Sequence, residues 1–504
     1  MTRTCKLLFL PVFLLQAGFF WFVSQHRLID ADEGYYALAA RLVLQHKTPY
    51  LDFFFPQAPL LPYVYAGWLK LAGISWFSVR TFSALLTAIL GGLMYSFVCR
   101  ETGRWAAGIA AVVLFASSSL VFAWFPLVKT FALATLCLFL AYVILTRPSA
   151  SSPGWLLAVA GLFFGLSVDT RSYVVGISPV FLWWIWRENS RRAGRLLWFL
   201  GGFAAGIGPS LALFLASPGA YLFNNLGFHA VRSDAGLIGD WHNKAKIVWL
   251  LFTGSHTGFQ FSILSASCAA GLILLRRRRT AASLLAFLIA FMLGIISLLP
   301  TPGYLQYFCI SVPFLIVAAV CLGSEYLISL QSPRALRRAG AACALLLASF
   351  VGFAFLNFRD YLFTGREVPG IFGAAPNWTL EQVTAVSLAI DQLTSPGEKV
   401  ASFWPGYLFV SWTDPYPGFE NDFGGGVSQR FTAEKRQKYH LVYDPEINAA
   451  FARHGPRFAV VGNQGHFVGG PEESACITML HGYGYRLARM VGRTSIYECC
   501  ERSR

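Results

Sequence analysis

A series of long apolar segments, separated by short basic loops, limits what this chain can fold into more than any other feature. A helix needs roughly 20 apolar residues to cross a membrane. Charged residues make up only 13% of the 504 residues, against about 25% in soluble domains. We therefore predict a polytopic α-helical membrane protein with about 11 spans. The candidate segments are 5–24, 78–99, 104–123, 125–146, 154–170, 173–187, 196–217, 257–275, 281–299, 304–329 and 338–357.

The net charge of +15 has the sign of a nucleic-acid-binding protein, but its distribution points to a membrane instead. The basic residues gather in short loops such as 187–195 and 276–279, and such loops face the cytoplasm. This places the N-terminus on the cytoplasmic side of the plasma (inner) membrane and the first loop, 26–77, on the opposite side. We read the first apolar run as a retained signal anchor because it lacks a small-x-small cleavage site. The expected partner is membrane lipid, with no nucleic acid.

The composition changes near residue 358. Short β-prone runs at 399–403 and 458–462 follow a helical pattern at 380–393, and turn residues surround them. The sequence predicts two domains. Residues 1–357 would form the transmembrane domain, and residues 358–504 an extracytoplasmic α/β domain.

The first outer loop concentrates acids in a chain that is otherwise poor in charge. Asp30, Asp32 and Glu33 lie at the start of a predicted amphipathic helix, and Asp52 precedes an aromatic, proline-rich turn. The structural interpretation is that these residues cap and anchor a surface helix, although one acid suffices to cap a helix. Because there are more acids than capping needs, we select Asp32, Glu33 and Asp52 as candidate catalytic residues and treat Asp30 chiefly as a cap.

The stretch "DADEGYYALAARLVLQHKTPYLDFFFPQAPLLPYVYAGWL" (30–69) resembles the outward first loop of the C-type glycosyltransferases. It is similar to the bacterial relatives of the protein O-mannosyltransferases and of the lipid A aminoarabinose transferases, and the similarity ends at "SVRTFSALL" (78–86). The resemblance implies transfer of a sugar from a polyprenyl-phosphate donor to an unidentified acceptor on the outer face. It also implies that Asp32 is the acidic residue beside the acceptor. Gln57 departs from the family, because the aminoarabinose transferases have a lysine in this turn.

Sugar transfer to a hydroxyl needs a base, and a leaving lipid phosphate needs cations. Few basic residues lie in the short outer loops. The candidate substrate-binding residues are Arg171, Lys129, His229, Arg232, Tyr304, Gln306 and Tyr307. Each has a structural alternative: Arg171 can pair with Asp169 or reach lipid headgroups, and the tyrosines can belong to an interfacial aromatic belt.

The sequence Asp30-Ala31-Asp32 has the D-x-D pattern of divalent-metal sites. Two acids alone leave a magnesium site incomplete, since the ion needs further oxygen ligands. We therefore expect no required cofactor, with a divalent metal as the alternative.

Two other classes of function compete with an inverting glycosyltransferase. A membrane transporter or a lipid or glycan flippase explains the spans equally well, but such proteins have repeats and mid-membrane ionisable groups. The sequence has no evident internal repeat. A non-catalytic assembly or sensor protein is the second alternative, and the acids of the first loop argue against it. Within the enzyme class, a ligase that moves whole glycans from a lipid diphosphate is also open.

Overall fold

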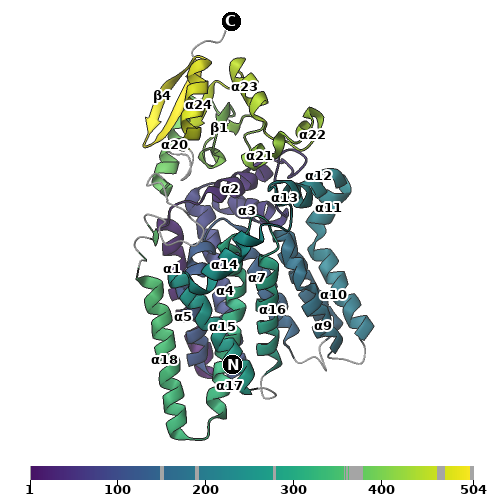
Figure 1. The fold of residues 1–504 in the computed structure, drawn as a ribbon, viewed down its shortest axis with the longest axis vertical. Helices are drawn as coiled ribbons and strands as arrows, with labels where there is room; N and C mark the ends of the chain where they lie inside the picture. Colours follow the sequence, from purple (N-terminus) through teal and green to yellow (C-terminus); the bar gives the residue numbers. More distant parts are fainter. Residues whose placement is uncertain are drawn as a thin grey trace.

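The computed structural model describes residues 2–147, 153–187, 192–275, 280–356, 358, 361–362, 378–462 and 471–499. Long helices run side by side in a bundle, and the strands of the C-terminal part lie beyond one end of it (Figure 1). The first helices of the bundle are α1 (Arg3–His26), α4 (Trp76–Thr102), α5 (Trp105–Ser117), α6 (Ser119–Trp124), α7 (Thr130–Leu145), α8 (Gly154–Thr170), α9 (Ser178–Arg187), α10 (Arg192–Gly206) and α11 (Gly208–Ala216). The later ones are α14 (Trp241–Thr253), α15 (Ser255–Leu275), α16 (Ala281–Ser297), α17 (Val312–Ser329) and α18 (Pro333–Phe355).

Within the described residues, five helices are long and apolar enough to cross a membrane, or six if a bent pair forms one span. The bent pair is α10 and α11, which meet at 60°. Shorter apolar helices account for other predicted spans, since 104–123 breaks at Ser118 into α5 and α6. The protein is thus a multi-pass, mostly helical membrane protein, and the number of eleven spans stays a prediction.

The polar break predicted at 167–172 coincides with the end of α8. This helix ends at Thr170, and a 3-10 segment, η2 (Ser172–Ile177), leads into α9. Arg171 lies at the junction in an extended conformation. The break therefore places Arg171 at the end of α8, where the chain leaves the helix.

Two helices of the first loop, α2 (Ala31–Leu44) and α3 (Leu60–Ala72), lie between the bundle and the C-terminal part (Figure 1). The expected surface helix is wrong in one respect. Every residue of α2 from Glu33 to Leu42 is buried, because the bundle covers one side of the helix and the C-terminal part covers the other.

The C-terminal part contains a five-stranded sheet with strand order β2-β1-β3-β5-β4. The strands are β1 (Lys399–Ser402), β2 (Asp414–Pro415), β3 (Phe458–Val461), β4 (Tyr485–Val491) and β5 (Thr494–Cys499). Strand β1 pairs in parallel with β2 and β3, whereas β5 is antiparallel to β3 and β4. Short helices lie around the sheet: α20 (Leu380–Leu393), α21 (Gly425–Ser428), α22 (Ala433–Lys438), α23 (Asp444–Ala452) and α24 (Pro471–Gly482).

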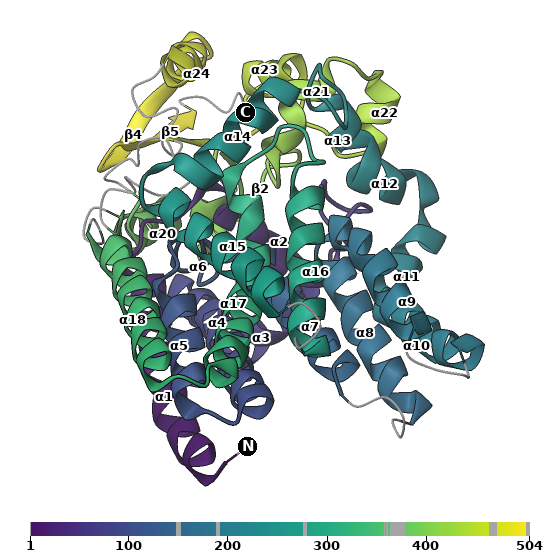
Figure 2. The ribbon, with the colours of Figure 1, turned by 60° about the horizontal axis from the view of Figure 1, so that its bottom comes forward.

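Further short elements complete the bundle and the C-terminal part. They are α12 (Pro218–Leu222), η3 (Phe223–Gly227), α13 (Phe228–Val231), η4 (Leu305–Ser311), η5 (Pro405–Leu408) and η6 (Asp422–Gly424). In the view turned by 60°, α12 and α13 again lie near α21 and α22 (Figure 2). The contact is aromatic, since the rings of Phe223 and Tyr439 stack 4.0 Å apart.

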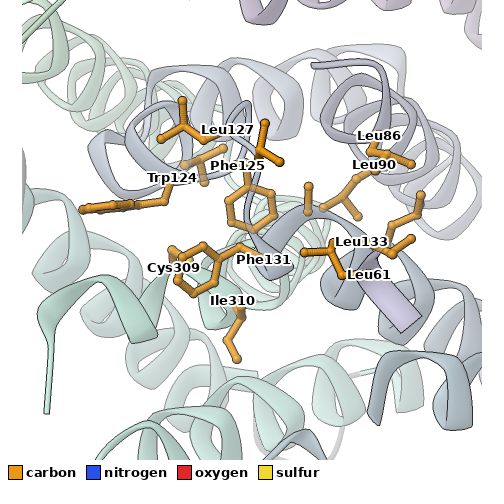
Figure 3. Packing of buried hydrophobic residues seen from close by; sticks show 14 of the residues in the cluster. Leu61, Leu86, Leu90, Trp124, Phe125, Leu127, Phe131, Leu133, Cys309 and Ile310 are labelled. Carbon is orange, nitrogen blue, oxygen red and sulfur yellow. The ribbon is translucent and has the colours of Figure 1, made fainter. Parts of the chain in front are cut away.

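The segment from Trp124 to Phe131 packs in the middle of the apolar core. Figure 3 shows Phe125 and Phe131 together with Leu61, Leu90 and Ile310 from three other elements. The neighbouring side chains fix the backbone of this segment, and Lys129 lies within it. Buried apolar side chains thus surround a charged residue at the end of the bundle that faces the C-terminal part.

Candidate active site

The acids of the first loop meet where α2 begins. Asp30 is the N-cap: its carboxylate accepts the N–H of Asp32 at 3.1 Å, and Glu33 Oε1 accepts the N–H of Asp30 at 2.8 Å. This reciprocal pair is a capping box, which satisfies otherwise unpaired donors at a helix start. The prediction that an acid caps this helix is confirmed, and the cap is Asp30.

Glu33 points into the bundle and has no exposed surface. Its carboxylate forms a two-pronged ion pair with Arg80 of α4, with Nη2–Oε1 at 2.6 Å and Nε–Oε2 at 3.0 Å. Arg80 also donates to the carbonyls of Ser24, Arg27 and Leu28. Glu33 therefore joins α2 to α1 and α4. Its location corrects our expectation of direct contact with a substrate, because Arg80 and the backbone occupy the carboxylate.

Lys129 lies between the other two acids. Its ammonium nitrogen is 2.6 Å from Asp30 Oδ1 and 2.9 Å from Asp32 Oδ2, and it lies 4.5 Å from the centre of the Trp124 ring. The side chain of Lys129 is 4% exposed and that of Asp30 11%, whereas Asp32 is 35% exposed. Asp32 is therefore the member of this triad that a substrate can reach.

The two aspartates have different affinities for protons. Burial raises the pKa of Asp32 and the charge of Asp30 raises it further, so that it lies above its usual value although Lys129 opposes the shift. Burial also acts to raise the pKa of Asp30, but Lys129 and Arg27 outweigh it and lower that pKa. A carboxylate pair with separated pKa values is the common arrangement for acid–base work. It makes Asp30 the ionised partner of Lys129 and Asp32 the more basic group.

Arg171 is buried close to this triad. Its Nη1 lies 2.5 Å from the hydroxyl of Thr130, the residue after Lys129, and its guanidinium lies over the rings of Phe131 and Tyr173. Asp169, the structural alternative as a partner, instead accepts the backbone N–H of Ser210 at 3.1 Å. Among the described residues Arg171 has no ion pair, and its Nε has no hydrogen-bond partner.

Further aromatic side chains lie around Arg171. The Tyr307 ring lies 5.1 Å from the guanidinium of Arg171 and 5.5 Å from the ring of Tyr304, which is 41% exposed. Burial raises the pKa of Tyr36, a residue of α2. The charge of Asp32 adds to this rise, and the charge of Arg171 opposes it. We did not select Tyr36 from the sequence, although its spacing of four residues from Asp32 places both on one helix face.

His229 and Arg232 lie near the same group but have other partners. His229 Nε2 is 3.0 Å from the carbonyl of Pro56, and burial, with the charge of Arg232, lowers the pKa of His229 to about 4. It is therefore neutral at pH 7 and supplies no positive charge. Arg232 donates to the carbonyls of Thr301 and Pro302, so it holds the loop that precedes Tyr304.

Asp52 and Gln306 are the remaining candidate residues from the sequence. Asp52 is exposed, and its carboxylate accepts the N–H of Thr48 at 2.6 Å. Among the described residues none of its bonds reaches Asp32 or Lys129, so Asp52 stabilises a turn. Gln306 has a buried Oε1 with no described hydrogen-bond partner, and its predicted role in binding stays a prediction.

Two comparisons found known proteins to which this chain is similar. Residues 56–221 match the model of the dolichyl-phosphate-mannose-protein mannosyltransferase family. The chain resembles the structure of ArnT from Cupriavidus metallidurans bound to undecaprenyl phosphate, with a TM-score of 0.64, 14% identity, and coverage of 99% of this chain and 98% of the other. No curated protein matches the sequence significantly.

A further similar structure is that of the arabinofuranosyltransferase AftD from Mycobacteria, with a TM-score of 0.57 and 15% identity. The match covers 100% of this chain but 40% of AftD. Together the comparisons confirm the resemblance to the C-type glycosyltransferases, and the family match begins at residue 56, after the acids at the start of α2. The chain has the fold of ArnT, and it shares that fold over nearly the whole length of both chains.

Proposed function

We propose that the protein is a membrane glycosyltransferase that moves a sugar from a polyprenyl-phosphate donor to an acceptor hydroxyl on the outer face. The observation that carries the proposal is the position of Asp32. Its carboxylate is the exposed member of a triad with Asp30 and Lys129, and Arg171 bonds to the hydroxyl of Thr130, the residue after Lys129. A proton acceptor and an available cation thus lie side by side.

In the proposed reaction the acceptor oxygen attacks the anomeric carbon of the donor from the face opposite the phosphate. Asp32 takes the proton of the hydroxyl as the new C–O bond forms. The bond between the anomeric carbon and the phosphate oxygen breaks, and the electron pair leaves with the lipid phosphate. The anomeric configuration is therefore inverted.

Arg171 and Lys129 would stabilise the charge that develops on the leaving phosphate. Arginine suits this task because its planar guanidinium binds phosphate through two parallel hydrogen bonds. Tyr304 and Tyr307, with Gln306, would line the space for the sugar. His229 and Arg232 would shape the site through the loops at Pro56 and Thr301.

We propose a polyprenyl phosphate as the donor lipid because the similar ArnT structure has undecaprenyl phosphate bound. The matched family also takes its mannose from a lipid phosphate, as its name states. The positive-inside pattern supports an outward first loop and C-terminal domain, 358–504, with the N-terminus in the cytoplasm.

We also propose that no divalent metal is required. The ammonium group of Lys129 lies between the carboxylates of Asp30 and Asp32, at 2.6 and 2.9 Å. A metal ion bound by the D-x-D pattern would need the same position. The transporter and flippase alternatives have less support, because the charged groups of the site gather at the outer end of the bundle and not along a path through it.

The experiment that tests this function compares cells with and without the gene. Mass spectrometry of polyprenyl-phosphate sugars and of cell-envelope glycans should show donor accumulation and loss of one glycan modification in the deletion strain. Wild-type protein should restore both, and Asp32→Asn should restore neither. Unchanged donor and glycans in the deletion strain would contradict the proposal.

A further inference from the structure

A tryptophan of the C-terminal part lies against the first turn of α2. Trp404, which follows β1 and is fully buried, donates its indole Nε1–H to the carbonyl of Ala31 at 3.0 Å. The indole lies flat against Gly34: a Cβ added there would be 2.6 Å from Trp404 Cε2 and 2.8 Å from its Nε1. Real Cβ atoms do not approach other atoms so closely, so glycine at position 34 is what admits the indole.

The bond from Trp404 acts on the peptide unit that carries Asp32. The carbonyl of Ala31 and the N–H of Asp32 belong to one planar peptide group. Trp404 binds the carbonyl end, and Asp30 Oδ1 accepts the N–H end at 3.1 Å. Asp30 Oδ1 is in turn the atom that lies 2.6 Å from Lys129. A continuous chain of contacts therefore leads from Trp404 to the charged triad.

Other side chains hold the Trp404 indole in place. It is nearly parallel to the ring of Trp76, at 4° and with centroids 6.2 Å apart, and Trp76 is the first residue of α4. Trp378 packs against it from another side, with centroids 4.3 Å apart. The indole is thus fixed between α2, the bundle and the C-terminal part, and a rotation about its side-chain bonds would meet one of them.

The other end of α2 is also held by the C-terminal part. Arg41, which is buried, donates to the carbonyls of Ser411 at 2.6 Å and Thr413 at 2.7 Å, and also to that of Leu408. Segment 404–413 therefore contacts α2 near both of its ends. A segment nearly 400 residues away in sequence sets the position of the helix.

We infer that Trp404 is a positioning residue for Asp32 and that Gly34 is the matching position on α2. The inference rests on the proposed function, in which Asp32 is the base. By fixing the Ala31–Asp32 peptide plane, Trp404 would hold the carboxylate at its distance from Lys129 and in line with the acceptor. The C-terminal part would then be needed for the reaction itself, apart from any contact that it makes with the acceptor.

The test uses the full-length protein with the substitution Trp404→Phe, which keeps an aromatic ring and removes the N–H donor. Trp412→Phe is the matched control, because Trp412 lies in the same segment but is 49% exposed and bonds to Thr394. Hydrogen exchange followed by mass spectrometry needs no activity. We expect peptides covering residues 30–36 to exchange faster in Trp404→Phe than in wild type, and the control to match wild type.

Kinetics supply the second measurement. Misplacement of a reacting group by about 1 Å can cost about 100-fold in rate, so we expect kcat of Trp404→Phe to fall about 10-fold to 100-fold with little change in the donor KM. The acid limb of the pH–rate profile should also move, which a mere loss of folded protein would not produce.

A double-mutant cycle tests whether Gly34 and Trp404 act through one contact. Gly34→Ala should reduce kcat on its own, and the Gly34→Ala/Trp404→Phe double variant should be no slower than the slower single variant. Additive losses would show that the two residues act separately and would overturn the pairing.

Unchanged exchange of residues 30–36 in Trp404→Phe would overturn the inference, whatever the reaction. The inference would also be overturned if the wild-type protein transfers sugar and Trp404→Phe transfers it at the same rate. Faster exchange in a protein whose wild type transfers no sugar would instead leave Trp404 as the residue that orders α2 and would contradict the proposed function.

Discussion

The ammonium nitrogen of Lys129 lies 2.9 Å from Oδ2 of Asp32, at the end of the bundle that faces the C-terminal part. This contact unites two residues that are 97 positions apart, one at the start of α2 and the other just before α7. It keeps a cation next to the carboxylate that we propose as the base.

The pH dependence of turnover should report the link between Lys129 and Asp32. The base must be deprotonated, and its pKa is raised by burial, so activity should fall with decreasing pH at a higher pH than an ordinary carboxyl, near 3.9, would give. Lys129 opposes that rise. Lys129→Met should therefore move the acid limb of kcat/KM to still higher pH. A limb that stays in place or moves to lower pH would contradict the coupling.

Arg171 should govern the use of the donor. We expect Arg171→Ala to raise the donor KM and to weaken binding of undecaprenyl phosphate. Arg171→Lys should restore only part of the loss, because lysine lacks the two-pronged geometry. Arg187, which lies over the rings of Trp183 and Trp184 at the far end of α9, offers a control for loss of an arginine–aromatic contact. Equal donor kinetics in Arg171→Ala and wild type would remove Arg171 from the phosphate site.

Glu33 should matter for folding more than for chemistry. Glu33→Gln leaves Arg80 as a buried charge without its carboxylate, and breaking such a pair typically costs about 3–5 kcal/mol. We expect less protein in the membrane and a lower unfolding temperature in detergent. Glu498→Gln is the control, since the pair of Glu498 with Arg457 is largely exposed and exposed pairs contribute about 0–1 kcal/mol. A fully stable but inactive Glu33→Gln would support a catalytic role after all.

The orientation in the membrane can be tested with single cysteines. Positions 52 and 430 should react in intact cells with a thiol reagent that cannot cross the membrane, because both belong to the proposed outer face. Position 278 lies outside the described residues, and the positive-inside pattern predicts that it is cytoplasmic. Labelling at 278 in intact cells would refute this topology.

The sequence alone predicted the membrane class and the cap of α2, and it selected Asp32, Lys129 and Arg171, which the structure brings close together. Apolar length, capping and loop charge are local or additive signals, so they can be read along the chain. The helix at 380–393 and the strand at 458–461 were predicted for the same reason, since their patterns are local.

The contacts that give the residues their roles were not predictable in this way. Whether Glu33 faces a substrate or Arg80 depends on how α2 packs against α4, which no local pattern encodes. Likewise, Arg171 is available because Asp169 bonds to Ser210 instead. The contact of Trp404 with Gly34 joins positions 370 residues apart, and glycine 34 alone had no evident purpose.

The central claim, that Asp32 is the base, is tested most directly by sugar transfer in Asp32→Asn compared with its abundance in the membrane. Since Asp30 is the cap of α2, the variant should fold, insert and bind donor lipid like wild type. Loss of a positioned base typically costs about 10²–10⁴ in rate, so we predict that turnover falls by about that factor. Wild-type turnover in Asp32→Asn, at equal membrane abundance, would contradict the account.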